Sequence, residues 1–382
     1  MIALARKTIV HEWRRFVPAV FAVGFSGVLL AVQAGLVMGI FGSAAVYVTA
    51  SSADLWAGYP GTQSVNFGRD IGPDVEMRLR MDPAVAEVEP YLWVEGDWYN
   101  QQRSGGGVPV FVSGIRTGPD AMMFSRLLTP RLRQQLREPG AVIVDRADTQ
   151  QLGTPVGGSA WLNGQHVQVV AAITGLRALG GVNVLASPDT ARRLQSNEAG
   201  AGSTYFVARL REPGDPAQAA AAKGRLTASG NASFGPFTVW SADEFARRSQ
   251  LYWMFDTGAG IAVLFMAAIV CLVGAVVTSQ SLMAVVAGSA REYAMLNALG
   301  ASLLSLSRVV LEQACWIGGL GLVLGGLTSG LLLWLAAQYD VPVDMNLPVA
   351  LGCAALVASL ALASGLVAIR GLLRAEPAML LR

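Results

Sequence analysis

Four long stretches without a single charged residue constrain this chain more than any other feature of its sequence. They cover residues 16–53, 257–290, 313–339 and 345–369, and none contains Asp, Glu, Lys or Arg. A helix of about 20 apolar residues is long enough to cross the hydrocarbon core of a bilayer. Each stretch exceeds that length, and the sequence therefore predicts four transmembrane α-helices.

The charged residues gather between Asp54 and Asp256. This middle segment holds 19 of the 28 Lys and Arg residues and 20 of the 26 Asp and Glu residues, so it is polar and almost neutral. The fold class that we predict is a membrane protein with a large mixed α/β extracytoplasmic domain inserted between helices 1 and 2. A net charge of +2 offers no basic surface for nucleic acid.

The remaining basic residues set the orientation, because cytoplasmic loops of membrane proteins are enriched in Lys and Arg. With four spans, all of them fall on one side: Arg6, Lys7, Arg14, Arg15, Arg291, Arg308, Arg370, Arg374 and Arg382. The short turn at 340–344 carries acids and no bases, so it belongs outside with the middle segment. Both termini are therefore predicted to be cytoplasmic.

The predicted organisation has nine parts. They are a cytoplasmic amphipathic segment 1–15, transmembrane helix 1 at 16–48, the extracytoplasmic domain 49–250, transmembrane helix 2 at 251–280, a cytoplasmic coupling loop or helix 281–303, transmembrane helix 3 at 304–338, an external turn 339–346, transmembrane helix 4 at 347–369 and a cytoplasmic tail 370–382. The first apolar stretch is longer than the roughly 7–15 apolar residues of a signal peptide, so we expect it to be retained.

The middle segment has a mixed pattern. Residues 151–176 lack charge but are rich in Gly, Pro and Asn, which break helices, so we place them outside the membrane. Runs rich in β-branched residues predict strands at 108–115, 141–145, 167–174, 183–186, 203–210 and 237–240. Helical periodicity predicts helices at 121–137 and 216–229.

A Ser-x-x-Glu pattern, Ser241 with Glu244, predicts a helix start just before the second span. Two interpretations fit the residues after this start. A helix continuing through Tyr252 and Trp253 would join the outer domain rigidly to the membrane helix. Alternatively, the helix simply ends there, with both aromatic side chains anchored at the membrane surface.

Catalytic and cofactor motifs are missing from the sequence. There is no phosphate-binding Gly-x-x-x-x-Gly-Lys-Ser/Thr loop, and the only lysines are Lys7 and Lys223. His11 and His166 have no neighbours at metal-ligand spacing. The carboxylate pairs Glu87 with Glu89 and Asp243 with Glu244 are interpreted as solvated surface. We expect no cofactor in this chain and no enzyme activity of its own.

Small residues and one charge pair stand out in the apolar stretches. Glycines four residues apart allow helices to pack closely, either within one chain or between two copies; they are Gly35 with Gly39, Gly321 with Gly325, and Gly326 with Gly330. Arg308 and Glu312 lie four residues apart at the start of the third span and can form an ion pair on one helix face. The other interpretation of this pair is a role in relaying force from the cytoplasm.

The segment Arg291–Ser302 resembles the cytoplasmic loop of FtsX/MacB-type ABC transporter permeases, and its Glu-Tyr-Ala start is most similar to DevC-like exporter permeases. Three further matches lie in the expected order. They are His11–Phe16 followed by Gln33-Ala34-Gly35, Leu311-Glu312-Gln313-Ala314 before a glycine-rich helix, and the ending Glu376–Arg382. Together they cover the membrane part of the chain.

This resemblance implies a permease subunit in the bacterial inner membrane that forms a homodimer and contacts membrane lipids. It also implies an ABC ATPase partner that binds the ATP and Mg, together with a periplasmic adaptor protein and an outer-membrane channel. The ATPase would dock on Glu292, Tyr293, Met295, Leu296, Leu299 and Gly300. ATP-driven motion would then move the outer domains and expel a hydrophobic or lipid-like substrate.

Two other functions are compatible with the same features. A mechanotransmitter would use the outer domain to activate a periplasmic cell-wall hydrolase and would transport nothing. A membrane-anchored sensor would dock an ATPase for signalling. An interfacial helix lying on lipid is the alternative to ATPase docking for residues 292–300.

Overall fold

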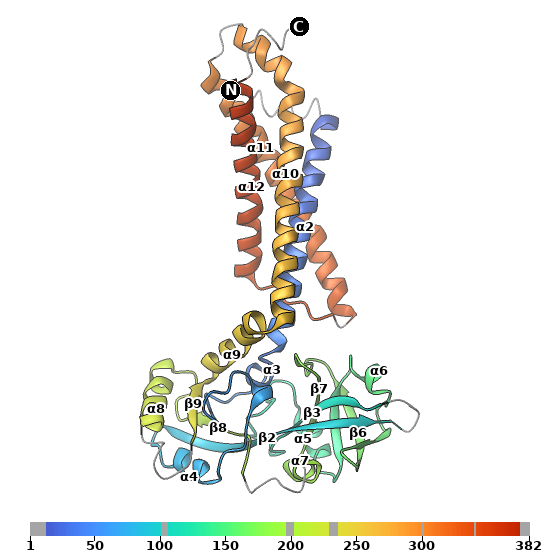
Figure 1. Ribbon diagram of the computed structural model, residues 1–382, viewed down its shortest axis with the longest axis vertical. Coiled ribbons are helices and arrows are strands. Elements are labelled where there is room, and N and C mark those ends of the chain that lie inside the picture. Colours follow the sequence, from blue (N-terminus) through green and yellow to red (C-terminus); the bar gives the residue numbers. More distant parts are fainter. Residues whose placement is uncertain are drawn as a thin grey trace. The chain divides into compact units, whose positions relative to one another are not determined.

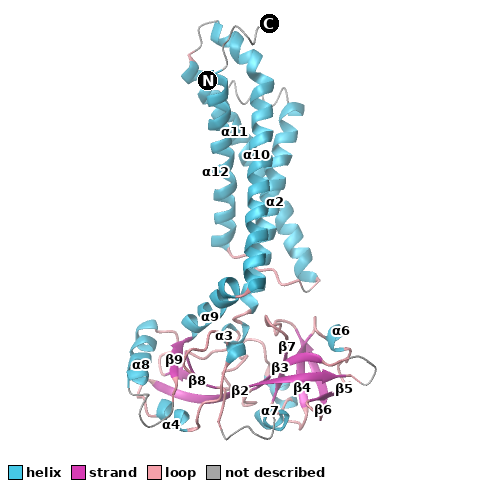
Figure 2. Cartoon of the chain, in the orientation of Figure 1, coloured by secondary structure: helices cyan, strands magenta, loops and turns pink. Residues whose placement is uncertain are grey.

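The chain divides into two units in a computed structural model that describes residues 13–100, 106–195, 202–228, 236–298, 302–339 and 341–374. The first unit comprises Met1–Ile40 and Ala259–Arg382, and the second comprises Phe41–Gly258. The long apolar helices belong to the first unit and the described strands to the second (Figures 1 and 2).

The first unit is built from four helices: α2 (Trp13–Ser43), α10 (Gly258–Ala298), α11 (Leu303–Gln338) and α12 (Leu347–Arg374). Each contains a segment long and apolar enough to cross a membrane, with a mean hydropathy between 1.9 and 2.8. The four predicted apolar helices are therefore confirmed. The shortest of these helices has 28 residues, which at 1.5 Å per residue is about 42 Å.

Helix α2 contributes most to the core of this unit. Phe16, Ala19, Val23 and Leu30 of α2 are buried in a cluster with side chains from α10, α11 and α12. The hydroxyl of Ser26 also donates a 3.1 Å hydrogen bond to the carbonyl oxygen of Gly274 on α10. Many other apolar side chains among the described residues of this unit are exposed, as expected for helices whose solvent is lipid.

The second unit contains two sheets that share one long strand, β2. Six strands in the order β3-β7-β4-β6-β5-β2 close into a barrel, because β2 also pairs with β3. An open sheet in the order β2-β8-β1-β9 continues from the other part of β2; β2, β8 and β9 of this sheet are labelled in Figure 1. The strands are β1 (Leu55–Gly58), β2 (Val85–Tyr99), β3 (Val108–Gly114), β4 (Ala141–Asp145), β5 (Ser159–Leu162), β6 (Gln165–Ile173), β7 (Val182–Ala186), β8 (Tyr205–Leu210) and β9 (Thr238–Ser241).

Apolar residues fill both sheets. The barrel interior is lined by side chains such as Leu92, Val110, Val142 and Val184. The open sheet is apolar on both faces, since successive residues of a strand point to opposite sides. In β1, Leu55 and Ala57 join the cluster beneath α4 and α8, whereas Trp56 between them joins the aromatic cluster on the other face.

Short helices cover these sheets or connect their strands. They are α3 (Val46–Thr49), α4 (Asp74–Arg80), α5 (Pro130–Gln135), α6 (Thr149–Leu152), α7 (Pro188–Leu194), α8 (Pro216–Ala228) and α9 (Ala242–Leu251), with a 3₁₀ turn η1 (Val65–Phe67) and a π-helical turn η2 (Tyr252–Asp256). The hydroxyl of Ser241 accepts a hydrogen bond from the amide of Glu244, which confirms the predicted start of α9.

One element prediction is wrong, and one of two open interpretations is excluded. The expected helix 121–137 is helical only from Pro130 to Gln135, because proline favours the first turn of a helix and interrupts one that precedes it. Of the two interpretations for the residues after Ser241, the continuous helix into the second span is excluded: the chain stays helical through Tyr252 and Trp253 but is interrupted at Thr257, which is extended at φ −104° and ψ 142°. Helix α10 begins only after this residue, at Gly258.

Candidate functional site

The predicted ATPase-docking segment lies at the end of α10. Glu292, Tyr293, Met295 and Leu296 belong to this helix, which continues past Ala290, where the uncharged stretch ends, to Ala298. The side chain of Met295 is 48% exposed. Leu299 and Gly300 lie outside the described residues, as do most of the residues at the two chain ends that resemble the permease family. The docking role remains a prediction.

Gly39 of α2 lies against the loop between α11 and α12, whereas Gly35 lies against both this loop and Leu333 of α11. A Cβ atom added to Gly39 would lie 2.1 Å from the carbonyl oxygen of Pro342, and one added to Gly35 would meet the Leu333 side chain at 2.9 Å. The amide of Asp344 donates a 3.0 Å hydrogen bond to the carbonyl oxygen of Gly35. These glycines let the loop approach the backbone of α2.

The other two glycine pairs differ in their surroundings. A Cβ on Gly321 would lie 2.7 Å from the Val23 side chain, and one on Gly325 would lie 2.8 Å from the carbonyl oxygen of Gly24. This pair packs α11 against α2 within the chain. Gly326 and Gly330 have no heavy atom within 4 Å of an added Cβ, and both line an apolar cavity of about 260 Å³ among α2, α11 and α12.

Arg308 and Glu312 are both on α11, at the start of its apolar segment. The ion pairs formed by the described side chains do not include one between these two residues. Their pairing, and their alternative role in relaying force, remain predictions.

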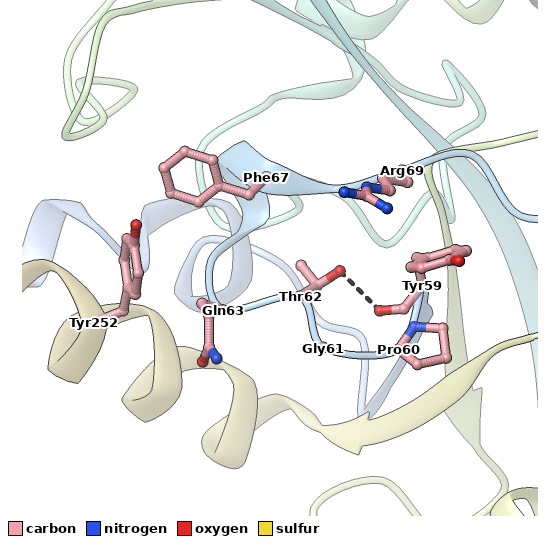
Figure 3. Close-up of a pocket in the computed structure, with 8 residues that line it drawn as sticks. All are labelled: Tyr59, Pro60, Gly61, Thr62, Gln63, Phe67, Arg69 and Tyr252. Atoms are coloured by element: carbon pink, nitrogen blue, oxygen red, sulfur yellow. Dashed lines mark hydrogen bonds between the residues drawn. The ribbon is translucent and has the colours of Figure 1, made fainter. Parts of the chain in front are cut away.

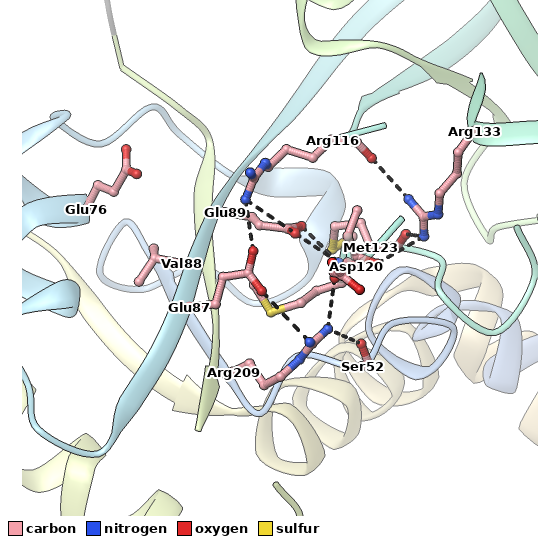
Figure 4. Close-up of polar contacts among 12 residues, drawn as sticks. Ser52, Glu76, Glu87, Val88, Glu89, Arg116, Asp120, Met123, Arg133 and Arg209 are labelled. Carbon is pink, nitrogen blue, oxygen red and sulfur yellow. Dashed lines mark hydrogen bonds and ion pairs between the residues drawn. The ribbon is translucent and has the colours of Figure 1, made fainter. Parts of the chain in front are cut away.

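The Glu87 and Glu89 pair is not simply solvated surface. Both lie on β2, but Glu89 is fully buried, and the amide of Met122 donates to both of its carboxylate oxygens at 3.0 Å. Burial is the main cause that raises the pKa of Glu89 above its ordinary value. Arg116 lies 3.1 Å from Glu87 and 3.7 Å from Glu89, so one guanidinium serves both carboxylates (Figure 4).

Arg133 holds the loop that covers Glu89. This buried guanidinium donates hydrogen bonds of 3.0, 3.1 and 2.8 Å to the carbonyl oxygens of Arg116, Ala121 and Met123 (Figure 4). The cluster thus ties the loop to β2 through charge-assisted hydrogen bonds. Its groups are engaged with one another and with the backbone, which indicates a structural role and not a catalytic one.

A cavity of about 310 Å³ opens beside the residues that lead into the second apolar helix. We call it the aromatic cavity; it is lined by Tyr59, Pro60, Gly61, Thr62, Gln63, Phe67, Arg69 and Tyr252 (Figure 3). The Phe67 ring lies 5.3 Å from that of Tyr252, edge to face, and 6.0 Å from that of Trp253, stacked. The Arg69 guanidinium carbon lies 5.3 Å from the centre of the Tyr59 ring.

No cluster of three or more His, Cys, Asp or Glu residues suited to a metal ion occurs in the ranges that the structure describes. In the second unit, Asp145 and Asp148 are both buried. The carboxylate of Asp145 accepts hydrogen bonds from the amides of Leu176 and Arg177. Burial, followed by the Asp145 charge, raises the pKa of Asp148 to about 6.

Parts of the chain are similar to known proteins. Residues 263–377 match the family model described as FtsX-like permease C-terminal. The periplasmic region of MacB from Actinobacillus actinomycetemcomitans is 12% identical with a TM-score of 0.37, covering 52% of this chain and 94% of that chain. The extracellular domain of the noncanonic ABC-type transporter YknZ from Gram-positive bacteria is 13% identical with a TM-score of 0.33, covering 49% and 99%. No curated protein matches the chain significantly.

Four apolar helices attached to a polar α/β unit define an integral membrane protein. Within that class, the match over residues 263–377 shows that α10, α11 and α12 are similar to the FtsX-like permease C-terminal domain.

The aromatic cavity was not predicted from the sequence. Tyr252 and Trp253 were expected at the membrane surface, but Phe67 and Arg69 lie almost 200 positions earlier in the chain. Contacts between η1 and η2 bring these residues together. Tyr252 and Trp253, singled out as aromatic anchors, were the sequence signal closest to this site.

Proposed function

We propose that the chain is the permease subunit of an ATP-driven ABC exporter, of the DevC-like kind, whose ATPase is a separate protein. The observation that carries this proposal is the FtsX-like permease match over α10, α11 and α12. Two copies would form the permease, with residues 49–250 outside the cytoplasm and both termini inside it. A periplasmic adaptor and an outer-membrane channel would complete the exporter.

The course of α10 supports coupling between the ATPase and the membrane. The helix continues for eight residues beyond Ala290, or about 12 Å, and this extension contains Glu292 to Leu296. A push on a helix is transmitted along its length because its backbone hydrogen bonds resist compression. We infer that docking on this extension transmits ATP-driven motion toward the outer unit, where a hydrophobic or lipid-like substrate is expelled.

The test is a mild-detergent pull-down of the tagged full chain, followed by mass spectrometry and an ATPase assay. We expect an ABC ATPase and an adaptor protein to be recovered. Leu296→Asp should abolish recovery of the ATPase or its stimulated turnover, because a charge replaces an apolar contact. Asn297→Asp, which adds the same charge to the neighbouring polar position, is the matched control.

Three outcomes decide between the candidate functions. Recovery of an ATPase with an adaptor, lost only in Leu296→Asp, supports export. Recovery of a cell-wall hydrolase in place of the adaptor would support the mechanotransmitter. If no ATPase is recovered with the unmodified chain, the proposed subunit role is wrong.

A further inference from the structure

The aromatic cavity is formed by segments that are hydrogen-bonded near both ends of the second unit, where the chain leads into the apolar helices. The amide of Leu179 donates a 3.4 Å hydrogen bond to the carbonyl oxygen of Ser43, the last residue of α2. The carbonyl oxygen of Leu179 accepts a 2.9 Å hydrogen bond from the side chain of Asn66 in η1. At the other end, the Trp253 indole donates to the hydroxyl of Ser64 at 3.2 Å. The loop around η1 that forms the cavity is therefore held next to both places where the chain enters or leaves the second unit.

Large apolar side chains remain exposed at this place. Phe67 is 48% exposed, Leu251 is 52% exposed and Phe255 is 55% exposed. Leu251 and Phe255 precede the apolar helix by only a few residues. Such side chains are unfavourable in water, but aromatic residues are favoured at the boundary between lipid headgroups and hydrocarbon.

The cavity also presents hydrogen-bond donors. Arg69 is exposed and forms no ion pair with any residue in the described ranges. The side-chain oxygen of Gln63 accepts a 3.1 Å hydrogen bond from Arg248, which leaves its NH₂ group as a donor. The neighbouring carboxylate of Asp70 accepts hydrogen bonds from Gln195 and Thr204 instead.

We propose that the aromatic cavity binds the phosphate group of a membrane phospholipid. The guanidinium of Arg69 and the amide of Gln63 donate hydrogen bonds to the phosphate oxygens, and a planar guanidinium suits this geometry. Phe67 and Tyr252 on one side and Tyr59 on the other pack against the glycerol and the first methylene groups (Figure 3). The exposed Phe67, Leu251 and Phe255 favour a lipid over a free phosphate, because a lipid would cover these side chains and a free phosphate would not.

This site goes beyond the export function and does not depend on it. Its role is to anchor the second unit to a lipid surface. The anchor consists of residues in and around η1 and η2 alone, so the assay below needs neither the ATPase nor a transported substrate.

The experiment titrates the purified full chain in detergent with phosphatidylglycerol and counts bound lipid by native mass spectrometry. Arg69→Gln should weaken the tightest binding event by about tenfold, because a charge-assisted hydrogen bond to phosphate is lost. Arg69→Lys should recover part of the affinity. Arg131→Gln is the matched control, since Arg131 is an exposed arginine on α5 and the change removes the same charge.

Two further ligands separate the possible occupants. Diacylglycerol with the same acyl chains lacks the phosphate and should not compete, whereas inorganic phosphate should compete only weakly because it lacks apolar groups. Equal competition by inorganic phosphate would overturn the lipid assignment. If Arg69→Gln binds like Arg131→Gln, the site is wrong; if Arg69→Gln fails to fold, Gln63→Leu decides, and an unchanged affinity in that variant refutes the proposal.

Discussion

Replacing Gly39 by alanine tests how the loop between α11 and α12 packs on α2. The new Cβ would lie 2.1 Å from the carbonyl oxygen of Pro342, 2.4 Å from its carbonyl carbon and 2.7 Å from the Cα of Val343. All three are backbone atoms, so no side-chain rotation relieves the overlap. The loop, which the Asp344 amide fastens to Gly35, has to move away from the helix.

The expected cost reflects two opposing contributions. Overfilling a packed interior typically costs about 1–3 kcal/mol, and a backbone obstacle places Gly39→Ala at the upper end of that range. Alanine favours the helix over glycine by roughly 0.5–1 kcal/mol. We therefore expect a net loss of about 2 kcal/mol, seen as a melting temperature several degrees lower for the full chain in detergent.

Gly326→Ala is the matched control for this prediction. Gly326 is also a glycine inside an apolar helix, but an added Cβ there meets no heavy atom within 4 Å. This variant keeps the gain in helix propensity without the overlap, so its melting temperature should be unchanged or slightly higher. Equal melting temperatures for Gly39→Ala and Gly326→Ala would refute the packing described for the loop.

Three further predictions concern the second unit, each read from melting temperatures of the full chain in detergent. The pKa of Asp148 is raised to about 6, mainly by burial. The folded state therefore disfavours the charged carboxylate, and the free energy of unfolding falls as pH rises from about 4 to about 6. Asp148→Asn should therefore stabilise the protein by about 1–3 kcal/mol at neutral pH and by little near pH 4; equal gains at both pH values would contradict this. Arg133→Met should destabilise by about 3 kcal/mol because three carbonyl oxygens lose a donor, and a loss below that of an exposed Arg131→Met control would argue against its role. The hydrogen bond from Arg225 is the main cause that lowers the pKa of Asp82. Arg225→Gln should therefore destabilise the protein at pH values above the ordinary carboxyl pKa and should have no effect once Asp82 is protonated. A loss of stability that does not depend on pH would contradict this pairing.

The sequence was sufficient for elements whose signal is local. Four uncharged stretches predicted the apolar helices, and β-branched runs such as 108–115 and 141–145 predicted strands β3 and β4. These patterns arise because one element meets one kind of environment along its length. The closed barrel was not predicted, since closure depends on the pairing of β2 with β3 and β5 at the same time.

Long-range contacts explain the predictions that were wrong. Residues 121–128 show helical periodicity, but their apolar side chains fill the aromatic core and Phe124 adopts a positive φ of 51°. The same loop buries Glu89, although a Glu-x-Glu pattern on a strand is typical of an exposed face. The partner that covers a residue is set by segments distant in the chain, which local patterns do not report.

The glycine pairs illustrate the same limit in the first unit. Their spacing predicted close packing, and Gly321 and Gly325 do pack against α2. Gly35 meets Leu333 of α11, but the backbone that Gly39 meets belongs to a loop, which no spacing rule identifies. The aromatic cavity likewise depends on a contact between η1 and η2, which lie far apart in sequence.

Strand β2 makes the second unit a single piece for protein engineering. Its residues Val85–Tyr91 belong to the open sheet and Leu92–Trp98 to the barrel, with no linker between them. A graft that exchanged only the barrel would have to cut this strand and break hydrogen-bonded ladders on both sides of the cut. Chimaeras between related permeases should therefore exchange the unit whole, at positions near Phe41 and Gly258, where its chain passes into the apolar helices.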